Sequence, residues 1–187
     1  MHDKREEIMT AARTAAQAHG YHGLNFRDLA AATGVKSASV HYHFPTKADL
    51  GAALARRYRE EAEETFAAIS AAAADPSKRL RQYAAVFRRA LENENRMCMC
   101  GFMAAETDDL PDAVKAEVKA FGDANVAWLA GVLAAAHPGR SAKANRGHAL
   151  AVFAAISGAQ LIARSRGDVA AYDSIIAAYR ASGLIPS

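Results

Sequence analysis

The stretch NFRDLAAATGVKSASVHYHFPTKADL, residues 25–50, decides the fold because it predicts two short helices joined by a tight turn. The first helix is expected at about residues 26–33, with Asn25 as its N-cap and Gly34 as the left-handed residue that ends it. The second is expected at about residues 37–44 and should stop at the proline that follows, whose ring cannot continue the hydrogen-bond ladder. Two short helices around a Gly-containing turn form a helix-turn-helix.

Helical spacing divides this stretch into an inward and an outward face. The residues that can point inward and form a small core are Leu29, Thr33, Val35, Val40 and Phe44. With Val40 inward, the second helix and its ends expose short or hydrogen-bonding side chains, which suit base edges and phosphate oxygens. The residues predicted to contact DNA are Lys36, Ser37, Ala38, Ser39, His41, Tyr42, His43, Thr46 and Lys47.

This segment resembles the operator-binding segment of the TetR family of bacterial transcriptional regulators. The matching residues are Gly34, Val35, His43, Phe44 and Lys47. The family more often has Tyr where this chain has His41, and Tyr42 comes next, so either residue could contact phosphate. The resemblance implies a dimeric regulator, usually a repressor, which binds a palindromic operator and is released by a small-molecule effector.

Composition favours an all-α protein. A chain of 187 residues can bury roughly 70% of its unfolded surface, and 51% hydrophobic but only 7% aromatic residues suit helices packed on small side chains. Two cysteines and no signal-peptide pattern predict a cytoplasmic location. The longest uncharged run, residues 147–163, is 17 residues long, against about 20 for a membrane span. We therefore predict a buried helix there and no membrane contact.

Basic residues are concentrated near the predicted DNA-binding segment. Residues 1–59 contain nine Lys or Arg against five Asp or Glu, a balance of +4, whereas the remainder contains fourteen against fifteen, or −1. This distribution places the positive charge where DNA would bind. A surplus of this size is also common on ordinary solvated surfaces, so charge alone does not identify the function.

Periodicity and capping residues predict further helices on both sides of this unit. A helix at residues 3–19, ended by Gly20, should brace the helix-turn-helix through Ile8, Ala11, Ala12, Ala15 and Ala18. Thr46 and Asp49 form a capping box that starts a helix to about residue 74, roughly 40 Å long at about 1.5 Å per residue. In the family that the chain resembles, the corresponding helix transmits ligand binding to the DNA-binding heads.

Four more helices are predicted after residue 75. Their ranges are about 76–93, 111–136 and 142–166, with the last beginning after Asp168. We predict a three-helix DNA-binding domain at residues 1–50, which includes the start of the linking helix. The resemblance implies a larger helical domain at residues 51–187 that binds an effector and forms the dimer.

Residues 93–111 are the least regular part of the second half, and they combine three Met, two Cys and one Phe. Such side chains can fill an ordinary core or line an adaptable pocket. The segment is similar to one in a subgroup of these regulators, where the matching residues are Cys98, Gly101, Ala104 and Glu106. The residues predicted to form an effector pocket or a sensing site are Cys98, Met99, Phe102, Met103, Phe121 and Trp128.

The last two helices are rich in small and apolar residues, which a partner subunit could cover. In the family that the chain resembles, the corresponding helices form a four-helix dimer bundle. The residues predicted to lie in this interface are Ala151, Ala155, Gly158, Ile162, Tyr172 and Ile176.

Two other classes of protein were weighed. An enzyme is disfavoured because no metal-ligand spacing, nucleophile elbow or Gly-rich phosphate loop is found, which leaves only a cysteine-dependent reaction at Cys98. We accordingly predict no metal, cofactor or catalytic residue. An architectural protein that coats DNA without an effector would share the helix-turn-helix but protect DNA uniformly rather than at one palindrome.

Overall fold

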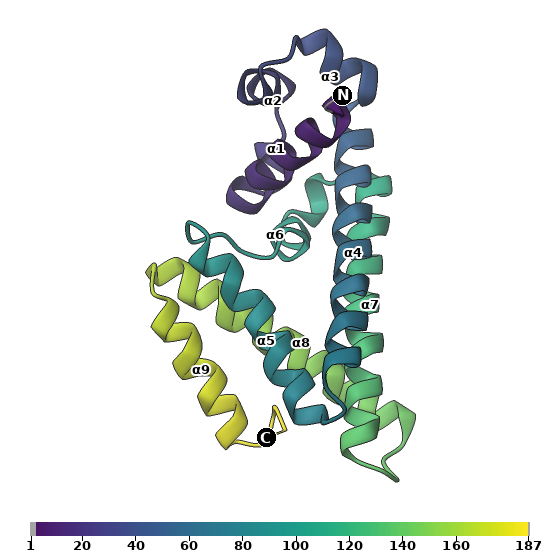
Figure 1. Ribbon diagram of the computed structural model, residues 1–187, viewed down its shortest axis with the longest axis vertical. Coiled ribbons are helices and arrows are strands. Elements are labelled where there is room, and N and C mark those ends of the chain that lie inside the picture. Colours follow the sequence, from purple (N-terminus) through teal and green to yellow (C-terminus); the bar gives the residue numbers. More distant parts are fainter. Residues whose placement is uncertain (1–2, 187) are drawn as a thin grey trace. The chain divides into compact units, whose positions relative to one another are not determined.

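The computed structural model describes residues 3–186, which form nine α-helices, two short 3-10 helices and no strands (Figure 1). The predicted all-α fold is confirmed. The chain divides into two compact units, and the division falls inside two long helices, α4 and α7.

The first unit contains the chain up to Glu60 together with Met99–Phe121. Its elements are α1 (Lys4–His19), η1 (Tyr21–Gly23), α2 (Phe26–Thr33), α3 (Ser37–His43), the start of α4 (Lys47–Ala72), α6 (Met99–Ala105), η2 (Thr107–Asp109) and the start of α7 (Asp112–Ala136). Helices α1 to α3 are called the head below.

The second unit contains Glu61–Cys98 and Gly122–Ser187. Its elements are the rest of α4 and α7 with α5 (Pro76–Glu92), α8 (Ala142–Arg166) and α9 (Val169–Ala181). The division into two functional domains at residue 50 stays a prediction, because compactness alone does not assign functions to the parts.

The caps of the helix-turn-helix follow the sequence prediction. The Asn25 side chain accepts hydrogen bonds from the first-turn amides of α2, and Gly34 adopts the left-handed conformation with φ 66° and ψ 19° at its end. Thr46 and Asp49 form the predicted capping box, with Thr46 N–H and Oγ1–H donating to Asp49 Oδ2 at 3.0 and 2.7 Å. These caps fix where α2 ends and where α4 begins.

Leu29, Val40 and Phe44 are buried in the head as expected. Thr33 and Val35 are half-buried at the edge of this core. The predicted inner face of α1 is partly wrong, because Met9 and Ala16 are buried, whereas Ala11, Ala15 and Ala18 are half-buried.

The core of the second unit is built on α5. Its buried residues are Leu80, Tyr83, Ala84, Phe87 and Leu91. The Trp128 ring stacks on Phe66 and Tyr83, with centroids 5.0 and 5.4 Å apart. The Tyr83 hydroxyl donates to Asn125 Oδ1 at 2.7 Å, and because this hydroxyl is buried, desolvation raises its pKa well above the usual value.

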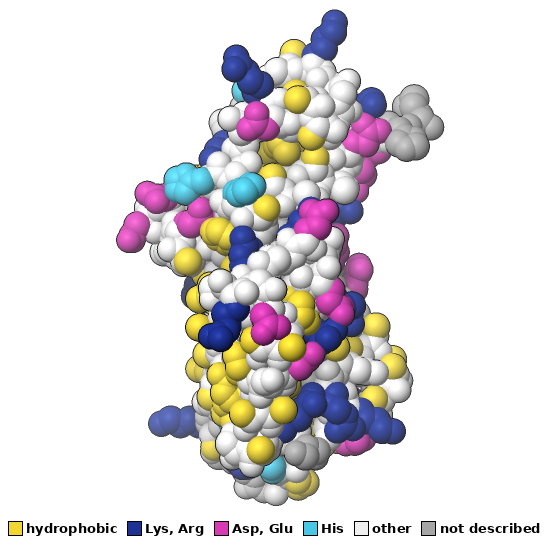
Figure 2. All heavy atoms as spheres, turned by 90° about the vertical axis from the view of Figure 1, so that its left-hand side faces the viewer, with side chains coloured by type: hydrophobic (Ala, Val, Ile, Leu, Met, Phe, Trp, Pro, Cys, Tyr) yellow, Lys and Arg dark blue, Asp and Glu magenta, His cyan; other side chains and the backbone are white. Residues whose placement is uncertain are grey.

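Helix α8 has a buried face and an exposed apolar face, so within this chain the predicted burial holds for one side of the helix. Leu150, Leu161 and Ile162 are exposed by 51, 54 and 49%. By length and composition, α8 is the one described helix that could cross a membrane, a test that core helices of soluble proteins also pass. Figure 2 shows hydrophobic side chains gathered over the part of the second unit that contains α8 and α9.

Candidate functional site

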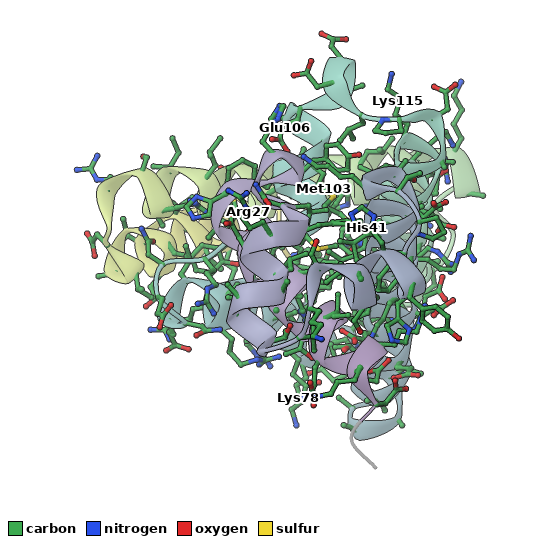
Figure 3. The ribbon with its side chains drawn as sticks, turned by 90° about the horizontal axis from the view of Figure 1, so that it is seen from above. Arg27, His41, Lys78, Met103, Glu106 and Lys115 are labelled. Atoms are coloured by element: carbon green, nitrogen blue, oxygen red, sulfur yellow. The ribbon has the colours of Figure 1, made fainter. Side chains whose placement is uncertain are left out.

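Helix α3 turns most of its side chains outward while Val40 holds it to the head. The predicted DNA-contacting residues that are exposed are Lys36, Ser37, Ala38, His41, Tyr42 and Thr46, and those that are half-buried are Ser39, His43 and Lys47. Figure 3 views this unit from above and labels Arg27 on α2 and His41 on α3. The helix therefore offers a continuous row of short and hydrogen-bonding side chains, which could enter a major groove.

His41 and Tyr42 differ in how freely they can reach a ligand. The His41 ring meets Phe26 edge-on, with centroids 4.7 Å apart. Tyr42 is 83% exposed, and its ring lies beside His43 with centroids 5.2 Å apart. The Tyr42 hydroxyl is therefore the more accessible of the two groups.

Lys47 lies at the start of α4, and its ammonium group is 4.5 Å from the centroid of the Tyr21 ring. Partial burial lowers the pKa of Lys47, while the negative charge of Glu106 acts in the opposite direction. The sequence predicted a phosphate contact for this side chain but not its packing against an aromatic ring. To contact a phosphate, the Lys47 ammonium group would have to move away from the Tyr21 ring.

The methionine-rich segment is well packed. Its buried residues are Met97, Cys98, Met99, Cys100 and Met103. Helix α6 continues through Gly101. Cys98 precedes this helix and donates its N–H to Gln160 Oε1 at 2.9 Å. Both thiols are buried, so a reagent must displace packed groups before it can reach them.

The six residues predicted for an effector site fall into both compact units. Met99, Phe102, Met103 and Phe121 belong to the first unit, and Cys98 and Trp128 belong to the second. In the first unit, the Phe121 ring packs against Tyr58 with centroids 5.4 Å apart.

The sequence prediction missed the buried polar groups of the second unit. Gln160 is fully buried; its amide nitrogen donates to the Phe87 carbonyl at 2.8 Å while its oxygen accepts from Cys98. Asn125 is also buried. A Gln or Asn at an apolar position of a helix was the available signal, because such a residue is buried only with hydrogen-bond partners. Within residues 3–186, no three His, Cys, Asp or Glu side chains are grouped so that they could hold a metal ion.

The predicted dimer residues differ in accessibility. Ala151 and Ile162 are exposed, and Ala155 and Gly158 are half-buried. Tyr172 and Ile176 instead pack inside their own chain, and the Tyr172 hydroxyl donates to the Ala84 carbonyl at 2.8 Å. Tyr172 and Ile176 therefore lie in the core of their own chain and not on its exposed surface.

A capped helix-turn-helix with an outward-facing α3, followed by a larger helical unit, defines a DNA-binding protein of the helix-turn-helix class. The model of the family described as "Bacterial regulatory proteins, tetR family" matches residues 8–54. A TetR-family transcriptional regulator from Agrobacterium tumefaciens is similar at 33% identity and a TM-score of 0.85, over 92% of this chain and 93% of that one. This chain belongs to the TetR family of transcriptional regulators.

Other solved structures share the same fold. A TetR transcriptional regulator from Legionella pneumophila is 28% identical, with a TM-score of 0.87 over 94% of each chain. A regulatory protein TetR from Rhodobacter sphaeroides has a TM-score of 0.83 over 93% of this chain and 95% of that one, and its 20% identity shows the likeness of fold alone. Among curated proteins no sequence matches this chain.

Proposed function

We propose that this protein is a homodimeric repressor that binds a near-palindromic operator through α3 and releases it when a small-molecule effector or a thiol-reactive compound binds. The observation that carries the proposal is the division of α3 into one buried anchor and an exposed row. Val40 is fully buried, whereas Ser37, Ala38 and His41 are exposed. A helix held in this way can present these side chains to base edges at fixed positions.

The contacts to DNA divide into two kinds. The side chains that would contact bases are those of Ser37, Ala38 and His41, because they are exposed in the first two turns of α3. Tyr42 would contact phosphate, because its exposed hydroxyl can reach beyond the helix. The Lys47 ammonium group would also contact phosphate, after it has moved away from the Tyr21 ring.

The exposed apolar face of α8 supports the dimer. Leu161 and Ile162 expose about half of their surfaces, and Gly158 lies one turn before them. The same patch on two copies can pair around a two-fold axis, which would also bring two α3 helices to one palindrome. Covering this face would remove the exposed apolar side chains of Leu161 and Ile162 from water.

Two kinds of effector fit the second half of the chain. A non-covalent ligand would use either the adaptable methionine side chains of α6 in the first unit or the aromatic groups around Trp128 in the second unit. A thiol-reactive compound would modify Cys98, whose burial means that an adduct must displace its neighbours. Brief treatment with a quinone or hypochlorite separates the two, because only the second mechanism is abolished in Cys98→Ser.

The test of the whole proposal is selection of duplexes from a randomised DNA library with the purified protein, followed by footprinting. The expected result is one near-palindrome whose half-sites are about 34 to 36 Å apart, or a multiple of that distance. Uniform protection of all duplexes would contradict it and indicate an architectural protein. Catalytic consumption of a thiol-reactive substrate would instead indicate a cysteine-dependent enzyme.

A further inference from the structure

Glu106 directly follows α6, and its carboxylate binds the backbone of η1, which joins α1 to α2 in the head. Glu106 Oε2 accepts from the Tyr21 N–H at 2.6 Å, and Oε1 accepts from the His22 N–H at 3.4 Å. Only 14% of the Glu106 side chain is exposed. A carboxylate that accepts backbone hydrogen bonds in such a site makes a strong, charge-assisted contact. Figure 3 labels Glu106 with Met103 of α6.

Gly20 provides the space for this carboxylate. Its φ of 67° and ψ of −158° belong to a region that is essentially restricted to glycine. A Cβ at this position would also lie 2.2 Å from Glu106 Oε2. The backbone of residues 20–22 is therefore shaped both to end α1 and to admit a side chain from α6.

Tyr21 connects the η1 backbone, to which Glu106 binds, with the start of α4. Its side chain is buried, and Lys47 Nζ lies over its ring. A Cβ at Gly51 would lie 2.8 Å from Tyr21 Cε2 and 3.1 Å from Val114 Cγ2, so α4 and α7 also approach closely here. Any movement of η1 relative to α6 must therefore disturb the head where it meets α4.

We propose that Glu106 is the positioning residue through which α6 sets the orientation of the DNA-binding head. This inference rests on the proposed function, in which an effector changes operator binding. Because Glu106 follows α6 without a spacer, a shift of α6 pulls the carboxylate from the amides of Tyr21 and His22. The Tyr21 amide then loses a charged partner in a mostly buried site, so the head gives up this orientation.

A mutant cycle read by amide hydrogen exchange tests this coupling without an effector or an operator. Glu106→Gln keeps the shape but removes the charge, and Phe102→Ala loosens α6 by truncating a half-buried side chain. Asp108→Asn is the matched control, because it removes an exposed carboxylate two residues away. Glu106→Asp serves as a second variant if Glu106→Gln does not fold, since it retains the charge but shortens the reach.

We expect Glu106→Gln to speed exchange at the Tyr21 and His22 amides about 10-fold or more, as a hydrogen bond to a charged group is weakened. Phe102→Ala should speed the same amides in the parent but add nothing in the Glu106→Gln background. Asp108→Asn should leave them unchanged. Additive effects of the two substitutions, or no effect of Phe102→Ala in the parent, would show that Glu106 is only a local structural contact.

Operator binding by the parent, the Phe102→Ala and Glu106→Gln variants and the double variant separates this inference from the proposed function. With the selected duplex, Phe102→Ala and Glu106→Gln should each weaken binding about 10-fold, and the double variant should be no weaker than Glu106→Gln alone. If no duplex is selected, the proposed function fails while the exchange cycle still decides the coupling. If a duplex is selected and the two losses add, the coupling fails while the proposed function stands.

Discussion

The face of α8 that is proposed to form the dimer can be tested at Gly158. A Cβ at this position would meet no heavy atom within 4 Å of its own chain, apart from the backbone of the helix itself. Replacing a mid-helix Gly should also stabilise the helix by roughly 0.5 to 1 kcal/mol. The isolated chain should therefore tolerate Gly158→Glu, so any damage must come from a partner.

The expected loss follows from symmetry. A two-fold interface brings two copies of each residue, so Gly158→Glu places two carboxylates into an apolar surface that includes Leu161 and Ile162. Burial of an unpaired charge costs several kcal/mol per ion after relaxation. With about 3 kcal/mol for each, the dimer is weakened by about 6 kcal/mol, which is a rise in Kd of about 10⁴-fold.

Sedimentation velocity over a range of protein concentrations measures this loss, and circular dichroism checks that the helices remain. Gly158→Gln is the matched control, because it has the same length as Glu and a smaller cost of burial. We expect monomers with lost operator affinity for Gly158→Glu and a smaller effect for Gly158→Gln. A Gly158→Glu protein that remains a dimer and binds the operator normally would place the interface elsewhere and refute the reasoning.

Three further predictions concern DNA, stability and the thiol. Lys47→Ala should weaken binding to all duplexes alike and lower the slope of log K against log salt concentration by about one unit per subunit. Ala38→Ser should instead change which bases are preferred. Binding of both variants to a randomised DNA library at several salt concentrations compares these effects. Gln160→Leu should lower the free energy of unfolding by about 3 kcal/mol, since the buried Cys98 N–H and the Phe87 carbonyl each lose a hydrogen bond; a loss below about 1 kcal/mol in urea would contradict this. Cys98→Ser should abolish any release of operator by a quinone, and an equal response in both proteins would remove the sensing role.

Helix ends could be predicted because they depend on local chemistry. Asn25 and Thr46 cap their helices through side chains that reach only two or three residues along the chain. The ends of α8 were likewise set by Ser141 and Gly167, which cap its two termini. Such interactions require no knowledge of the tertiary structure, so the sequence contains all that is needed.

The buried faces of the alanine-rich helices were harder to predict. In α1, alanines occur on several sides, and their spacing does not distinguish the face with Ala12 and Ala16 from the face with Ala11 and Ala15. In α8, apolar residues lie on most sides, so composition predicted burial where Leu161 is half exposed. A hydrophobic pattern identifies a face only where polar residues mark the opposite one.

The contact of Glu106 illustrates a different limit. Its partners are backbone amides 84 and 85 residues away in the sequence, and a backbone amide is present at nearly every residue. A backbone amide has no side-chain signature that would reveal such a pair in the sequence. Gly20 was predicted only as the end of α1, although its lack of a side chain is also required by the Glu106 carboxylate.

Two of the attachments between the head and the rest of its unit differ in how they can be released. Helix α4 begins at Lys47, directly after the Thr46 cap, so this attachment is covalent and rigid. The second attachment is the hydrogen-bonded contact of Glu106 with η1, which joins segments far apart in the chain. The second can be broken without unfolding a helix, and it follows a seven-residue helix rich in adaptable side chains. In the proposed coupling, a signal that acts on α6 moves the Glu106 carboxylate and thereby changes the orientation of α3.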